Sequence, residues 1–181
     1  MREIERRTTV SRRVFLQSTA AAPAAAAAFA MTISPYAAWA QSAKNLSPHT
    51  MVTLAQTARD IFPHDHIVDK YYIVAVSGYD GLAADPKMKA MLEEGVARLD
   101  ADAAAKYKVA NYLAVNWEPD RVVLLQGIAH TPFFGKLRGD LVVTLYNQKE
   151  LWPKFGYEGS SADKGGYIHR GFDDIDWLPG A

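Results

Sequence analysis

The sequence predicts a small all-α domain of about five helices, followed by an irregular C-terminal segment. Between residues 47 and 147, apolar residues recur at the three- and four-residue spacing of an amphipathic helix. Four of the five expected helix starts pair a polar residue with a proline, the order that favours the first turn of a helix. Strand-like alternation bounded by hairpin turns is not evident.

The first expected helix begins at Ser47 and Pro48, which supply an N-cap and a first-turn proline, and it ends before Pro63. Its expected buried face comprises Met51, Leu54, Ala55, Ala58, Ile61 and Phe62. A second helix is expected to start near Asp65, which would cap it, and to end around Gly78 or Gly81. Its expected buried stripe comprises Ile67, Tyr71, Val74 and Ala75.

Three further helices are expected, each opened by a polar residue and a proline: Asp85-Pro86, Glu118-Pro119 and Thr131-Pro132. The expected buried face of the third helix comprises Met88, Met91, Leu92, Val96 and Leu99. That of the fourth comprises Val122, Val123, Leu125 and Ile128, and that of the fifth Leu137, Leu141, Val142 and Leu145. Residues 41–147 are therefore expected to form one helical domain.

Residues 148–181 have a different composition, rich in glycine and in aromatic residues. A disordered tail would contain few aromatic residues, so we expect this segment to be ordered. Its aromatic side chains are expected to pack on the domain, on a partner protein, or, for different residues, on both. The candidate partner interface comprises Tyr157, Tyr167, Phe172 and Trp177.

The N-terminal residues have the pattern of a twin-arginine export signal, which a translocase receptor recognises. Its diagnostic residues are Ser11, Arg12, Arg13, Phe15 and Leu16. An alanine-rich stretch from Ala20 to Met31 follows, and Ala38-Trp39-Ala40 fits the small-x-small rule for cleavage after Ala40. This stretch contains Pro23 and is weakly apolar, which argues against a permanent membrane anchor. Residues 1–40 are thus expected to be a signal peptide, and the mature chain to be periplasmic.

Composition excludes several classes of function. Five of the 20 Lys and Arg residues and two of the 20 Asp and Glu residues lie in residues 1–40, which leaves 15 and 18 and a net charge of −3. No basic patch of the kind that binds nucleic acid is visible. The chain has no cysteine, so thiolate zinc sites, iron–sulfur clusters and c-type haem attachment are excluded.

Two clusters carry residue types that could do chemistry. His64-Asp65-His66, with Asp69 nearby, could hold a metal, although the alternative is a turn in which Asp65 caps a helix. Ser160 and Ser161 precede His169 and Asp173, but no nucleophile elbow frames either serine. The glycines of residues 156–171 form no phosphate-binding motif. No catalytic, cofactor-binding or metal residue is assigned, and His49, His130 and His169 are isolated in the sequence.

Four stretches carry a resemblance to a known family: SRRVFLQ (11–17), LAQTARDIFPHDH (54–66), LWPKFGYEGSS (151–161) and GGYIHRGFDDIDWL (165–178). Over about residues 47–178 the chain resembles the small subunit, subunit 3, of the gluconate 2-dehydrogenase family. The resemblance implies a non-catalytic helical subunit of a periplasmic FAD-dependent sugar or polyol dehydrogenase. In such complexes the large subunit holds the flavin, and a multihaem cytochrome subunit passes electrons to the quinone pool.

Three functions stay open at this point. A twin-arginine signal belongs to a cargo that folds before export, yet the mature chain offers no cofactor site to fold around. An accessory subunit that exports and stabilises a flavoprotein would explain both observations, because the flavoprotein carries the FAD. The alternatives are a stand-alone periplasmic module that binds a ligand or peptide, and a metalloenzyme built around His64, Asp65 and His66.

Overall fold

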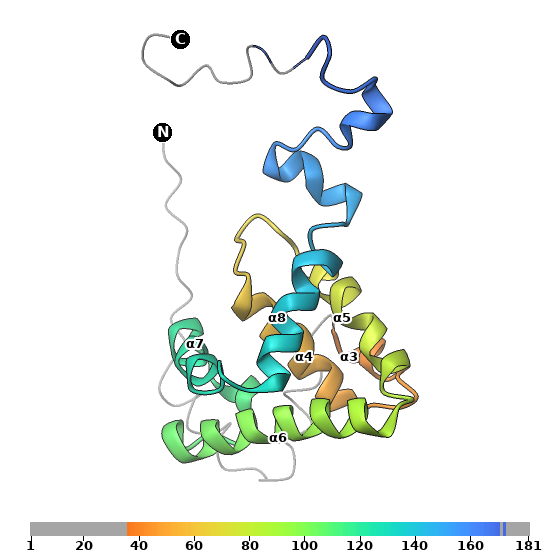
Figure 1. The fold of residues 1–181 in the computed structure, drawn as a ribbon. Helices are drawn as coiled ribbons and strands as arrows, with labels where there is room; N and C mark the ends of the chain where they lie inside the picture. The colour runs from red at the N-terminus through yellow and green to blue at the C-terminus, as the bar shows by residue number, and fades with distance from the viewer. Residues whose placement is uncertain (1–35, 171, 173–181) are drawn as a thin grey trace, which may run out of the picture.

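The computed structural model describes residues 36–170 and residue 172, and it confirms the all-α prediction. Within these residues there is no strand. The α-helices are α3 (Tyr36–Ala40), α4 (Pro48–Ile61), α5 (Lys70–Leu82), α6 (Pro86–Tyr107), α7 (Glu118–Gly127) and α8 (Pro132–Thr144), shown in Figure 1. Three 3-10 helices complete the described chain: η1 (Tyr112–Ala114), η2 (Lys149–Phe155) and η3 (Ser161–Lys164).

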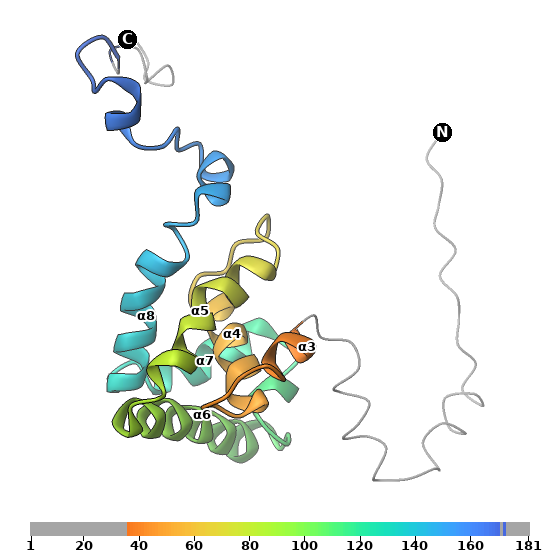
Figure 2. The same ribbon diagram turned by 90° about the vertical axis from the view of Figure 1, so that its right-hand side faces the viewer.

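Helix α4 is the centre of the domain, because α3, α5, α6, α7 and α8 all pack against it. Its Leu54, Ala55 and Ala58 have no exposed surface. Helix α6 runs beneath the other helices, while α5 and α8 stand side by side above it (Figures 1 and 2). The expected five helices of residues 41–147 are therefore present, arranged as a cluster around one of them.

Side-chain caps fix three of the helix starts as the sequence predicts. The Ser47 hydroxyl accepts a hydrogen bond from the Thr50 amide at 3.0 Å. The Asp85 carboxylate accepts from the Lys87 amide, and the Thr131 hydroxyl from the Phe134 amide. Helix α7 differs, since its N-cap residue is Trp117 and no side chain caps it.

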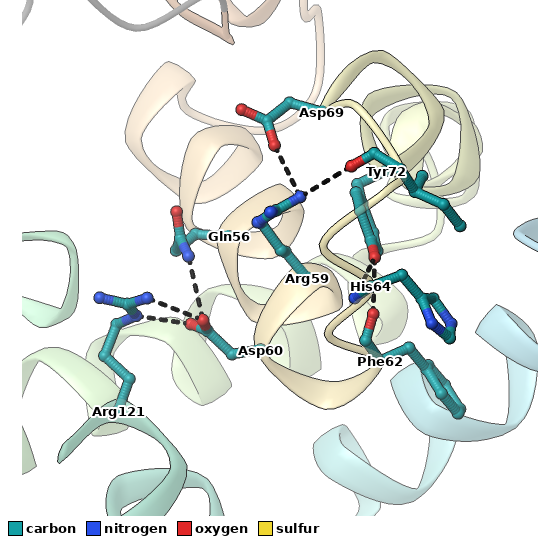
Figure 3. Close-up of polar contacts among 9 residues, drawn as sticks. Gln56, Arg59, Asp60, Phe62, His64, Asp69, Tyr72 and Arg121 are labelled. Atoms are coloured by element: carbon teal, nitrogen blue, oxygen red, sulfur yellow. Dashed lines mark hydrogen bonds and ion pairs between the residues drawn. The ribbon is translucent and has the colours of Figure 1, made fainter. Parts of the chain in front are cut away.

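The expected start of the second helix at Asp65 is wrong, because α5 begins at Lys70. Side-chain hydrogen bonds hold the preceding loop (Figure 3). The Arg59 guanidinium donates to the Ile67 carbonyl at 3.1 Å and to Asp69 at 3.0 Å. The Tyr72 hydroxyl donates to the Phe62 carbonyl at 2.6 Å. Asp65 therefore lies in a turn and caps no helix.

Three residues expected on buried faces are exposed instead: Val74, Val123 and Val142. The core positions of their helices are taken by other residues, among them Tyr72, Val76 and Leu124. Helices α5, α7 and α8 carry apolar residues on more than one side, so spacing alone leaves the rotation of each helix open. Tertiary packing decides which apolar stripe faces α4.

Helices α6 and α8 meet at Gly95, where a side chain has no room. A Cβ atom at Gly95 would lie 2.2 Å from the ring of Phe133, in the first turn of α8. Phe133 is 4 % exposed and so belongs to the core. This contact fixes the start of α8 directly on α6.

Helix α3 lies inside the segment predicted to be a signal peptide. Ala40 is completely buried in the core and Trp39 is packed against it. The export-signal residues Ser11, Arg12, Arg13, Phe15 and Leu16 lie outside the described residues, as does Trp177. Of the described helices, none is both long and apolar enough to cross a membrane.

The core contains a buried carboxylate, that of Asp60, whose side chain has no exposed surface. Arg121 from α7 donates to both of its oxygens, at 2.8 and 3.0 Å. The Tyr112 hydroxyl from η1 donates at 2.7 Å. Gln56, one turn earlier on α4, donates at 3.1 Å. Every oxygen of the buried carboxylate is therefore paired, as a buried charge requires.

We expect Arg121→Met to destabilise the domain by about 3–5 kcal/mol, because it leaves the Asp60 charge buried without its counter-charge. Urea unfolding followed by circular dichroism measures the change in free energy. Arg98→Met is the matched control, since Arg98 forms an exposed pair with Asp102 and its loss should cost at most about 1 kcal/mol. Equal losses in the two variants would contradict the prediction.

Candidate functional site

The most distinctive surface of the chain is its C-terminal segment, residues 148–170 and 172, which we name the arm. Figures 1 and 2 show the arm continuing from the end of α8 and extending away from the helical domain. Its first part contacts the domain, and its later part does not. The two parts differ in the exposure of their apolar side chains, which pack on the domain in the first part and face solvent in the later part.

The first part of the arm, η2, is anchored by Leu151, which has no exposed surface. The Trp152 indole N–H donates to the Tyr146 carbonyl at 2.9 Å. The Gln148 side chain donates to the Tyr71 carbonyl of α5, also at 2.9 Å. These contacts hold the first part of the arm, residues 148–155, which we name the arm root, against α5 and the end of α8.

An aromatic cluster anchors Phe155, the last residue of η2. The centroid of its ring lies 5.1 Å from that of His64, 5.5 Å from His66 and 5.4 Å from Tyr146. The imidazole Nε2 of His64 is 2.7 Å from the Tyr146 hydroxyl. Edge-to-face contacts of this kind stabilise beyond the apolar area they bury. The histidine turn thus packs against the arm.

Burial lowers the pKa of His64 below its ordinary value, and the nearby charges of His66 and Arg59 lower it further. The neutral imidazole is therefore the form that fits the cluster. Asp69, the fourth residue of the suggested metal cluster, pairs with Arg59 at 3.0 Å. Across residues 36–170 and 172, no group of three or more His, Cys, Asp or Glu side chains is placed to hold a metal ion.

The chain turns away from the domain at Gly156, whose φ of +71° is a left-handed conformation that favours glycine. The Tyr157 amide donates to the Trp152 carbonyl, and the Tyr157 ring lies 5.3 Å from the Trp152 ring. Beyond this point the large apolar side chains are open to solvent. Tyr167 is 60 %, Ile168 76 % and Phe172 77 % exposed.

The outer part of the arm is held by its own ion pairs. The Glu158 carboxylate contacts the Lys164 ammonium at 2.7 Å and the Arg170 guanidinium. The hydrogen bond from Lys164 and the two positive charges lower the pKa of Glu158. The Arg170 amide also donates to the Tyr167 carbonyl. These contacts close the outer arm into a loop that displays Tyr167 and Ile168.

A hollow of about 480 Å³ lies between the end of α8 and the arm. Four aromatic rings, an amide and a hydroxyl line it: Tyr146, Trp152, Phe155, Tyr157, Asn147 and Ser160. Its size is in the range of small-molecule sites. No hydrogen bond joins the side chain of Ser160 or Ser161 to His169 in the described chain, and Asp173 lies outside it.

Two features of the structure were not predicted from the sequence: a histidine–aspartate pair and an exposed isoleucine of the arm. His49, isolated in the sequence, pairs with Asp100 at 2.7 Å, and the hydrogen bond that the Asp100 carboxylate accepts raises the pKa of His49. The partners are 51 residues apart, and no local pattern connects them. Ile168 was also missed, although its exposure exceeds that of Tyr167. A search for all large apolar residues in the segment, rather than aromatic ones alone, would have found it.

Comparison with protein-family models, with curated proteins and with solved structures gave no match in any of the three searches. The arm and its root are therefore interpreted from their own geometry.

We expect the arm root to loosen as the pH falls below the ordinary histidine pKa of about 6.5. The pKa of His64 is lowered in the folded chain, so its contribution is complete above the pKa of the unfolded chain. That contribution is lost as the pH falls through the lowered pKa. Hydrogen exchange at the Tyr157 amide, corrected for intrinsic pH dependence, measures the opening.

His64→Gln removes the imidazole whose pKa is lowered and should weaken the pH dependence of the protection of this amide between pH 5 and 7. His130→Gln is the control, because His130 is exposed and precedes the opposite end of α8. A pH dependence that is unchanged in His64→Gln would contradict the assignment.

Proposed function

We propose that this chain is the non-catalytic small subunit of a periplasmic dehydrogenase complex, and that its arm binds the catalytic flavoprotein. The flavoprotein would hold FAD and oxidise a sugar or polyol of the gluconate type. A multihaem cytochrome subunit would be a further member of the complex. The chain would be exported through the twin-arginine translocase together with the folded flavoprotein.

The observation that carries this proposal is the division of the arm. Its root is built into the domain through Leu151, Trp152 and Phe155. Its outer loop is closed by Glu158 yet presents Tyr167, Ile168 and Phe172 to solvent. Large apolar side chains that are exposed on one short segment are typical of an interface with another protein.

The energetics of such a loop favour tight binding. Aromatic side chains are enriched among the few residues that dominate an interface. A loop that is already closed by its own ion pairs loses less conformational freedom on binding than a flexible tail. The position of the arm beyond the domain would let a partner surround it on several sides.

The sequence supports the export role. Arg12 and Arg13 fit the pattern of a signal for folded cargo, and the small subunits that the chain resembles accompany a flavin-bearing large subunit. If the large subunit lacks a signal of its own, binding through the arm would carry it across the membrane.

The second candidate is a stand-alone periplasmic module that binds a ligand or peptide. The hollow of about 480 Å³ at the arm root favours it, because four aromatic rings, Asn147 and Ser160 line that space. Ser160→Ala would weaken ligand binding in that case, because Ser160 lines the hollow, whereas Tyr167→Ala would leave ligand binding intact. In the proposed complex, Tyr167→Ala is the more damaging substitution for retention of the flavoprotein.

We expect deletion of residues 157–181 to leave a folded helical domain that no longer retains the flavoprotein. Tyr167→Ala should lose part of the same affinity, about 2 kcal/mol or roughly thirtyfold in Kd. Co-purification from the periplasm, read by the flavin spectrum, measures retention, and circular dichroism on the same samples measures folding.

Trp117→Ala is the matched control for the arm, since Trp117 is an aromatic residue 69 % exposed that lies outside the arm. It should leave retention of the flavoprotein unchanged. A truncated chain that stays folded and still binds the flavoprotein would place the interface elsewhere.

We also expect replacement of Arg12 and Arg13 by lysine to keep both this chain and the flavoprotein in the cytoplasm. Lysine preserves the charge but removes the planar guanidinium groups that a receptor can recognise. Cell fractionation followed by immunoblotting measures the distribution of both proteins. A flavoprotein that still reaches the periplasm would show that this chain is not its escort.

A further inference from the structure

The peptide bond after Ala40, the expected site of signal cleavage, lies at the end of a docked helix. Ala40 is the last residue of α3 and has no exposed surface. The Ser42 amide and hydroxyl both donate to the Trp39 carbonyl, at 3.0 and 2.7 Å. The Ala43 amide donates to the Ala40 carbonyl at 3.2 Å. The bond is therefore part of a hydrogen-bonded turn on a buried residue.

A single carboxylate on α5 holds the chain that follows. Asp80 accepts hydrogen bonds from three consecutive backbone amides, those of Lys44, Asn45 and Leu46, at 2.8 to 3.1 Å. The Asn45 side chain donates to the Asp80 carbonyl at 2.8 Å, and Leu46 is 4 % exposed. We name residues 36–46 the N-terminal clasp.

The charge of Asp80 strengthens this arrangement. Burial acts to raise the pKa of Asp80, but the three amide hydrogen bonds outweigh it, and the pKa is lowered. Hydrogen bonds to an ionised acceptor are stronger than those between neutral groups. The clasp is thus tied to α5 by charged hydrogen bonds and to α4 by the packing of α3.

A peptidase needs accessible backbone that it can draw into its own active site. A bond inside a docked turn offers this only in molecules that have opened locally, so its rate of cleavage follows the population of the open form. A twin-arginine cargo crosses the membrane already folded. The peptidase would therefore meet the clasp closed.

We propose that α3 is a permanent part of the folded domain and that the folded chain is not cut after Ala40. Removal of the export signal then takes place on the N-terminal side of Tyr36. The mature domain thus begins before residue 36 rather than at Gln41. The proposal does not depend on the identity of any partner.

The first test is the N-terminus of the exported protein. The chain is purified from the periplasm and its intact mass and N-terminal sequence are measured. We expect a chain that retains Tyr36–Ala40. An N-terminus at Gln41 would overturn the proposal.

The second test uses the purified full chain and needs no export. Elastase, which cuts after small residues, is added, and the rate of cleavage between Ala40 and Gln41 is followed by mass spectrometry. We expect this bond to be cut far more slowly in the folded chain than in urea. Equal rates in the two conditions would overturn the proposal.

Asp80→Asn should speed cleavage at this bond about tenfold, the factor produced by losing one hydrogen bond to a charged group. Asn45→Ala, which loses only the side-chain bond, should give a smaller increase. Asp102→Asn is the control, because Asp102 forms a surface pair on α6. Circular dichroism confirms that each variant is folded, and an unchanged rate in folded Asp80→Asn would overturn the role of the clasp.

Discussion

The buried carboxylate of Asp60 is the constraint on which the arrangement of this domain depends. A charge without solvent must be paired from several directions, and here the donors come from α4 itself, from η1 and from α7. The long chain between α6 and α7 therefore cannot take another path without leaving the carboxylate unsatisfied. Apolar packing gives the domain its core, and this network specifies which segments surround α4.

Arg59 and Asp60 are neighbours on α4 and tie it to two different parts of the chain. Asp60 faces α7, whereas Arg59 reaches the loop before α5, as Figure 3 shows. That loop positions the His64 side chain against Tyr146 and Phe155, at the root of the arm. The end of one central helix thus supports both the interior of the domain and the base of its most exposed segment.

The fold was largely predictable from the sequence, because its helix starts depend on local chemistry. Ser47, Asp85 and Thr131 cap the helices that follow them within three residues. The rotation of α5, α7 and α8 was not predictable, since Val74 and Val142 belong to apolar stripes that compete with the true core face. Thr53 and Thr57 have no exposed surface despite their hydroxyls, because other helices surround α4.

Of the candidate site, the aromatic content of the arm could be read from the sequence. Its division into root and outer loop could not, because His64 and Tyr146 are 82 residues apart.

The contact between Gly95 and Phe133 sets how much this fold can change. Glycine inside a helix lowers its stability by about 1 kcal/mol relative to alanine, so α6 taken alone would be the stronger helix with alanine at position 95. The contact with Phe133 prevents this gain in helix stability, because even a methyl group at position 95 would push Phe133 and the start of α8 away from α6. The direction of α8 also sets the direction in which the arm leaves the domain. The single hydrogen atom that stands in place of a side chain at position 95 therefore governs the orientation of a segment that lies far from it in the sequence.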